Sequence, residues 1–210
     1  MSKFKENNYD IWKKAVSPEI ANFLYKYFLL KKDVFYYLKE TRYLSPYDLS
    51  WGAHGDEQTE KRSYISYCDI AMENLSVSLL PKLSKRIGIN LHHQYSYTRC
   101  YYYGAELKRH MDRPECEISC TLNLGGDPWA IYIDPTGEKG NEGVKVILNQ
   151  GDMMVYKGCN LEHWREPFEG DKIVQTFLHF NNLDGPYKDN CTKFDNKDLP
   201  GLPSYFSKIA

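Results

Sequence analysis

Apolar residues near the N-terminus recur at intervals of three and four, which is the spacing of an α-helix. Ser17 has the side chain of a helix N-cap, and Pro18 and Glu19 after it are typical of a first helical turn. We therefore expect a helix that begins here. Its buried face should be one apolar stripe, made of Ile20, Phe23, Leu24, Tyr27 and Phe28.

A second helical pattern runs over roughly residues 65–87, and Gly88 is expected to end it. Pro81 should bend or split this helix, because proline cannot donate the backbone hydrogen bond of a helix interior. Residues 41–60 lie between the two helices and contain Pro and Gly at positions typical of a loop. The first part of the chain, about residues 1–90, is therefore interpreted as a helical support.

From about residue 92 the pattern changes to short runs of strand-forming residues separated by Gly, Pro, Asp and Asn. The expected strands cover residues 93–101, 118–124, 129–133, 144–148, 153–156, 163–165 and 173–180. Strands of this length and spacing are typical of a β-sandwich or barrel. We predict an α+β fold in a single domain, 1–210. A double-stranded β-helix (jelly roll) over about 91–182 is buttressed by the N-terminal helices, and 183–210 form an irregular C-terminal cover.

Charge and cysteine content narrow the class of protein. The chain has 27 basic and 28 acidic residues, so a nucleic-acid partner held by bulk electrostatics is not expected. No apolar run approaches the roughly 20 residues that span a bilayer, and the first residues lack the apolar core of a signal peptide. Six scattered cysteines do not resemble a disulfide framework, so we expect a cytoplasmic protein with no membrane association.

The candidate chemistry lies in the triplet His110-Met111-Asp112 and in His163, 53 residues after His110. Residues i and i+2 of a strand point to the same face, so the triplet would aim an imidazole and a carboxylate into one pocket. A histidine from a later strand would complete a group of two histidines and one carboxylate, the ligand set of non-haem Fe(II) oxygenases. Because so short a motif is common by chance, its surroundings matter.

Those surroundings resemble a known family. The segment from Tyr101 to Asp112 reads Y-x-x-G-x-x-L-x-x-H-x-D, and His163 is followed by Trp-Arg-Glu-Pro and, nine residues on, by Lys172. Over roughly residues 92–181 the chain is similar to 2-oxoglutarate- and Fe(II)-dependent dioxygenases of the prolyl 4-hydroxylase type, in particular to small microbial and phage-encoded oxygenases. The resemblance implies Fe(II), 2-oxoglutarate and O₂ as cofactor and cosubstrates, with His110, Asp112 and His163 as catalytic metal ligands.

The cation that would bind the distal carboxylate of 2-oxoglutarate has two candidates. The resemblance favours Lys172, with Tyr101 and Asn123 adding hydrogen bonds. The residues themselves also indicate Arg165, which would share the face of His163 on a regular strand. An inward arginine beside a metal needs an anion, and a guanidinium matches a carboxylate better than an ammonium group does. Either residue, or both, is therefore a candidate.

The resemblance implies hydroxylation of a C–H bond with release of succinate and CO₂. Its substrate would be a prolyl or other side chain of a protein or peptide, or a small molecule. Two alternatives stay open: a cupin-like metal dioxygenase that uses no keto acid, and a non-catalytic jelly-roll binding module. The chain has no G-x-S-x-G element, so a serine hydrolase is not expected. The sequence makes no prediction about oligomeric state.

Overall fold

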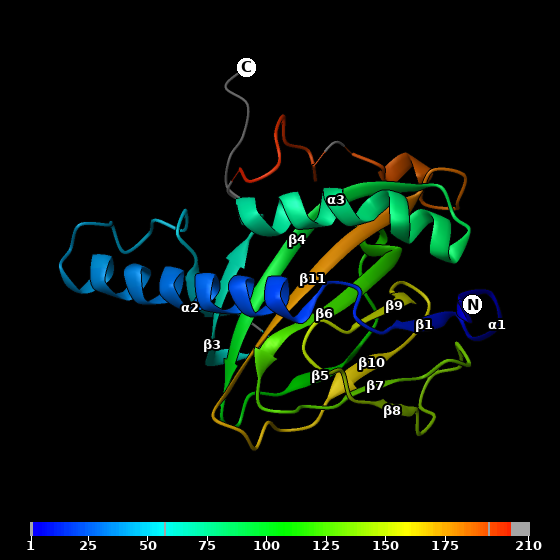
Figure 1. Cartoon of the computed structure of the whole chain (residues 1–210), viewed down its shortest axis with the longest axis horizontal. Helices are drawn as coiled ribbons and strands as arrows, with labels where there is room; N and C mark the ends of the chain where they lie inside the picture. The colour runs from blue at the N-terminus through cyan, green and yellow to red at the C-terminus, as the bar shows by residue number, and fades with distance from the viewer. Residues whose placement is uncertain (1, 57, 193, 203–210) are drawn as a thin grey trace.

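The computed structural model describes residues 2–56, 58–192 and 194–202. It consists of two antiparallel β-sheets with helices on one side (Figure 1). The helical elements are α1 (Phe4–Asn7), α2 (Pro18–Glu40), α3 (Ile70–Ile87), η1 (Pro114–Cys116) and η2 (Lys188–Asn190). The strands are β1 (Tyr9–Trp12), β2 (Ala53–Asp56), β3 (Glu60–Tyr67), β4 (Leu91–Tyr102), β5 (Leu107–His110), β6 (Ile118–Gly126), β7 (Ile131–Ile133), β8 (Val144–Val146), β9 (Met153–Lys157), β10 (His163–Arg165) and β11 (Lys172–Asn182).

The seven-stranded sheet has the order β1-β9-β6-β11-β4-β3-β2, and the four-stranded sheet has the order β5-β10-β7-β8. Apart from β2–β3, β3–β4 and β7–β8, strands that follow one another in the chain are separated within these sheets, and β11, the last strand, lies between β6 and β4. This arrangement is a jelly roll with few helices, as the sequence predicted. No helix of the described residues has the length and apolar character that crossing a bilayer requires.

Helix α2 begins where it was predicted, since the Ser17 side chain accepts a hydrogen bond from the backbone N–H of Ile20. The predicted buried stripe is partly wrong, because Ile20 and Phe23 are 49% and 66% exposed. The helix docks on the large sheet through a line of residues rotated from the expected one: Ala21, Leu24, Phe28 and Phe35. Periodicity indicates a helix, but the sheet beneath it selects which side is buried.

Helix α3 starts at Ile70 rather than near 65, because residues up to Tyr67 belong to β3 and Asp69 caps the helix. The Asp69 carboxylate accepts from the backbone N–H groups of Ala71 and Met72. Pro81 lies inside the helix without splitting it into two elements. Gly88 ends the helix in the left-handed conformation, with φ 70°, as the sequence predicted.

All seven predicted strands are present. A further strand, β5, ends at His110 and so includes the first residue of the triplet that was expected on a strand. Three more strands, β1, β2 and β3, were not predicted, and all three lie in the segment interpreted as a helical support. In β3 the buried residues include Ser63 and Ser66, so this strand lacks the apolar alternation on which the prediction relied. Residues 203–210 of the predicted C-terminal cover lie outside the described residues.

The two faces of β11 separate the core from the candidate site. Val174 and Leu178 pack with α2 and α3 in the main hydrophobic cluster. Phe177 and His179, of the opposite parity, line a cavity between the two sheets. Strand alternation therefore directs one set of side chains to the core and the other to the cavity.

Candidate metal centre

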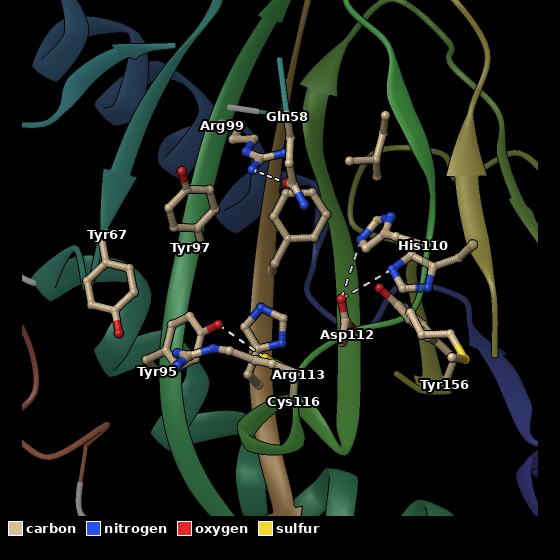
Figure 2. Close-up of a pocket in the computed structure, with 15 residues that line it drawn as sticks. Gln58, Tyr67, Tyr95, Tyr97, Arg99, His110, Asp112, Arg113, Cys116 and Tyr156 are labelled. Atoms are coloured by element: carbon tan, nitrogen blue, oxygen red, sulfur yellow. Dashed lines mark hydrogen bonds and ion pairs between the residues drawn. The ribbon is translucent and has the colours of Figure 1, made fainter. Parts of the chain in front are cut away.

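Three side chains converge on one wall of this cavity: His110, Asp112 and His163. One ligand atom from each lies within 4.8 Å of the others. Asp112 Oδ1 is 3.5 Å from His110 Nε2 and 3.4 Å from His163 Nε2 (Figure 2). His163 is buried, while the His110 side chain keeps a quarter of its surface exposed toward the cavity mouth. A group of two imidazoles and one carboxylate at this spacing could hold a divalent metal ion.

Strand pairing brings the two histidines together. His110 is the last residue of β5, His163 is the first residue of β10, and the two are directly paired. Asp112 lies beyond the end of β5, so the expectation that the whole triplet is on a strand is wrong. Its backbone N–H instead donates to the carbonyl of Gly158, at 2.9 Å, which returns the carboxylate to the same pocket.

Backbone carbonyls orient both imidazole rings. His110 Nδ1 lies 2.7 Å from the carbonyl oxygen of Lys108, and His163 Nδ1 lies 3.1 Å from that of Leu161. A carbonyl can only accept, so each Nδ1 carries the proton in the neutral ring. The lone pair of each ring is thereby placed on Nε2, the atom that faces Asp112, which is how metal-binding histidines are usually held.

The electrostatics of the group agree with this arrangement. Burial acts to raise the pKa of Asp112, but interactions with His163 and His110 outweigh it and hold that pKa well below its ordinary value. Burial acts to lower the pKa of His110, but Asp112 outweighs burial and raises it. The carboxylate is therefore ionised at neutral pH and available as a metal ligand.

The cavity has a volume of about 440 Å³ and draws its walls from both sheets. Its lining residues are Gln58, Tyr67, Tyr95, Tyr97, Arg99, Leu107, His110, Met111, Asp112, Arg113, Cys116, Tyr156, His163, Phe177 and His179. Figure 2 shows the aromatic rings of β4 on the side opposite the metal group. Tyr67 stacks on Tyr95 with ring centroids 5.0 Å apart. The cavity thus presents a metal-binding wall and an aromatic wall.

Arg165 is buried beside this cavity, although it is not itself one of the lining residues. Its pairing partner Leu107 and its neighbour Tyr156 both line the cavity. One Nη1 hydrogen donates to the carbonyl of Trp129, 2.8 Å away, whereas Nε and Nη2 have no hydrogen-bond partner among the described residues. Burial lowers the pKa of Arg165 to about 10, and no carboxylate of the described part of the chain forms an ion pair with it. A buried cation with unused donors is the feature expected of an anion site.

The other residues predicted to bind the cosubstrate lie in three different places. Tyr101 is buried near Arg165, against Trp129, and its hydroxyl accepts a hydrogen bond from Arg99. Lys172 is at the surface, where Nζ lies 2.6 Å from the carboxylate of Asp171, and it is not among the cavity residues. Asn123 is buried in β6 and binds backbone groups of Leu148 and Gly125, also away from the cavity.

Most residues that line the cavity were not among the predicted site residues, and three residues in or near it have polar side chains close to the metal group or the cavity wall. Arg99 faces the cavity and is paired with Asp56, at 2.5 Å, and with Gln58. His179 also faces the cavity, and Ser119 lies behind Asp112. Alternation along β4, β6 and β11 shows that these residues share one face of each strand. The sequence does not show whether that face points into the cavity.

Comparisons with known proteins identify the fold. No family model and no curated protein matches the chain. Among solved structures, a prolyl-4-hydroxylase from Pseudomonas putida superposes with a TM-score of 0.61 at 12% identity, over 86% of this chain and 95% of the other. HygX from Streptomyces hygroscopicus, with nickel and 2-oxoglutarate bound, has a TM-score of 0.56 at 11% identity, over 86% and 85%.

A third similar structure is the viral collagen prolyl hydroxylase of Paramecium bursaria Chlorella virus-1 in complex with 2-oxoglutarate. Its TM-score is 0.55 at 9% identity, over 84% of this chain and 96% of the other. Each match covers most of both chains, so the likeness extends beyond the β-core. At such low identity it shows the fold and not the reaction. The chain has the fold of the 2-oxoglutarate- and Fe(II)-dependent oxygenases, and a His-Asp-His group that could bind iron lies inside it.

Proposed function

We propose that this protein is an Fe(II)- and 2-oxoglutarate-dependent oxygenase that hydroxylates a C–H bond. The observation that carries the proposal is the convergence of His110, Asp112 and His163 on one wall of a cavity, within a fold shared with such oxygenases. The three side chains would supply three ligands to a metal ion and leave other positions for small molecules.

The metal would be held by His110 Nε2, His163 Nε2 and Asp112 Oδ1, the atoms that already face one another. Both imidazoles have their other nitrogen fixed by a backbone carbonyl. These rings therefore lose little freedom when a metal binds, which favours affinity. Together, bound Fe(II) and 2-oxoglutarate supply O₂ activation, with succinate and CO₂ as the products beside the hydroxylated substrate.

Arg165 is the better candidate for the distal carboxylate of 2-oxoglutarate. Its Nε and Nη2 are buried without a partner among residues 2–56, 58–192 and 194–202, and an anion would satisfy both. Lys172 already pairs with Asp171 on the outside of the large sheet. On β11, Lys172 points to the same side as Val174, which faces the helices. Phe177 points to the opposite side, which faces the cavity. Tyr101, adjacent to Arg165, would contribute a hydroxyl to the same site.

Other residues of the chain would bind and orient the substrate. Tyr95, Tyr97 and Phe177 present an apolar surface across the cavity from the metal group, and Gln58 supplies an amide near the edge. This surface suits an apolar side chain or ring and excludes water from the reacting C–H bond. A prolyl or other side chain of a protein or peptide is the substrate we favour, with an apolar small molecule as the second candidate.

The test is an anaerobic titration of the purified protein with Fe(II) and then 2-oxoglutarate, followed by visible absorption. We expect a metal-to-ligand charge-transfer band that is lost in His110→Ala. Peptides and small molecules would then be screened by succinate release in air.

Bound iron without the band would contradict keto-acid chelation and favour a cupin-like dioxygenase. A band with no O₂ consumption for any substrate would favour the binding module. Both results would count against the oxygenase proposed here, whereas the band together with substrate-dependent succinate release would support it.

A further inference from the structure

Only one of the two carboxylate oxygens of Asp112 faces the two histidines. Oδ1 faces His110 and His163, whereas Oδ2 accepts a hydrogen bond from Ser119 Oγ at 2.6 Å. Ser119 is fully buried in β6, so no water competes for this contact. A charge-assisted hydrogen bond of this length strongly limits rotation of the carboxylate.

The protons of this network can be assigned from its partners. Ser119 Oγ has one hydrogen and three neighbours: Asp112 Oδ2, the Cys116 carbonyl at 3.1 Å and His179 Nδ1 at 3.1 Å. The hydroxyl donates to the carboxylate, since that contact is the shortest and is charged. His179 must then donate from Nδ1 to Ser119 Oγ, which leaves Nε2 of His179 unprotonated.

The surrounding structure holds His179 and Asp112 in place. The His179 ring lies against Tyr95, with centroids 4.6 Å apart, and burial lowers the pKa of His179 to about 4, so the ring is neutral at neutral pH. The backbone of Gly158 also lies against the carboxylate, next to Ser119. A Cβ on Gly158 would lie 2.6 Å from Ser119 Oγ and still closer to Asp112 Oδ2. Only glycine allows the chain to approach the carboxylate this closely.

We infer that Ser119 and His179 are positioning residues of the metal centre: His179 holds Ser119, and Ser119 holds Oδ2 of Asp112 so that only Oδ1 faces the metal. This inference rests on the proposed function. Neither residue touches the metal-facing atoms, so both act through Asp112. Removal of such supporting partners typically costs about 10- to 100-fold in metal affinity.

The test measures Co(II) affinity of the purified, metal-free protein by calorimetry, together with the visible absorption of bound Co(II), which reports ligand geometry. We expect Ser119→Ala to weaken Co(II) binding by about 10- to 100-fold and to change the spectrum. The matched control is Ser96→Ala, which removes another buried serine hydroxyl, one with no hydrogen-bond partner in the part of the chain that the structure describes. That variant should bind Co(II) as the unmodified protein does.

Two substitutions of His179 separate hydrogen bonding from ring packing. His179→Phe keeps a ring against Tyr95 but removes the donor, and should weaken Co(II) binding less than Ser119→Ala does. His179→Asn restores an N–H donor and should bind more tightly than His179→Phe. If Ser119→Ala does not fold, the comparison of His179→Phe with His179→Asn still tests the positioning role.

The results distinguish this inference from the proposed function. If the unmodified protein binds Co(II) and Ser119→Ala binds it equally well with the same spectrum, the positioning role is wrong and the metal centre stands. Equal effects of His179→Phe and His179→Asn would remove His179 from the network. If the unmodified protein binds no divalent metal, the proposed function itself fails.

Discussion

Arg165→Met offers the sharpest test of where 2-oxoglutarate binds. Methionine fills much of the same volume but removes the guanidinium. This charge is fully buried, and within the described residues Nε and Nη2 have no partner. The substitution should therefore have opposite effects on two quantities: it should weaken 2-oxoglutarate binding and raise the stability of the protein without 2-oxoglutarate.

The magnitudes follow from the surroundings of Arg165. Loss of a desolvated charge-assisted contact costs about 1.5–3 kcal/mol, or about 10- to 150-fold in the dissociation constant of 2-oxoglutarate. Burial lowers the pKa of Arg165 from 12.5 to about 10, which corresponds to about 3 kcal/mol of destabilisation. Because the lowered group is a base, this penalty is fully present at every pH below the folded-state pKa.

Part of that penalty is offset by contacts that methionine would lose. The hydrogen bond to the Trp129 carbonyl and the contact of the guanidinium with the Trp129 ring, 4.8 Å from its centroid, are each worth about 1 kcal/mol. A net gain in the free energy of unfolding of about 1 kcal/mol is expected for Arg165→Met.

The assay is the anaerobic titration of the Fe(II)-loaded protein with 2-oxoglutarate, with urea unfolding of the metal-free protein as the stability measurement. Lys172→Met is the control, because it removes a surface charge paired with Asp171 and should change both quantities little. The reasoning is refuted if Lys172→Met weakens 2-oxoglutarate binding and Arg165→Met does not. Strong destabilisation by Arg165→Met would refute the claim that its charge is uncompensated.

Four further predictions concern the metal group and the core. Asp112→Ala should abolish turnover and metal binding while its circular dichroism spectrum stays that of the unmodified protein; retained turnover would remove Asp112 from the ligand set. Metal affinity should fall as the pH is lowered through the raised pKa of His110, since protons then compete for the ring; a calorimetric affinity independent of pH would contradict this. In the metal-free protein, His110 should stabilise the fold below a pH of about 6.5 and lose this effect as the pH rises through its raised pKa, a difference that disappears in thermal unfolding of His110→Ala. Phe28→Ala should cost about 3–5 kcal/mol in the free energy of unfolding, because Phe28 is fully buried against Tyr64; a loss below 1 kcal/mol would show that α2 is not docked as described.

Local signals in the sequence predicted much of the fold. The Ser17 cap and the Gly88 terminus depend on neighbouring residues alone, and both are where the sequence placed them. Strands with apolar alternation were also found. The strand β3 was not predicted, because Ser63 and Ser66 are polar residues that become buried only when neighbouring strands cover them. The exposure of Phe23 was not predicted either, because the position of the sheet determines which side of α2 is buried.

The members of the candidate metal group could be identified from the sequence, because H-x-D and a later histidine are side chains whose chemistry does not depend on their neighbours. The surroundings of that group depend on the fold. Alternation along β11 turns Lys172 away from the cavity and His179 toward it. The pairing of β10 with β5 buries Arg165 beside the cavity. The physical reason is strand register: a shift of one residue moves every side chain to the other face, and register is set by contacts between segments far apart in the chain.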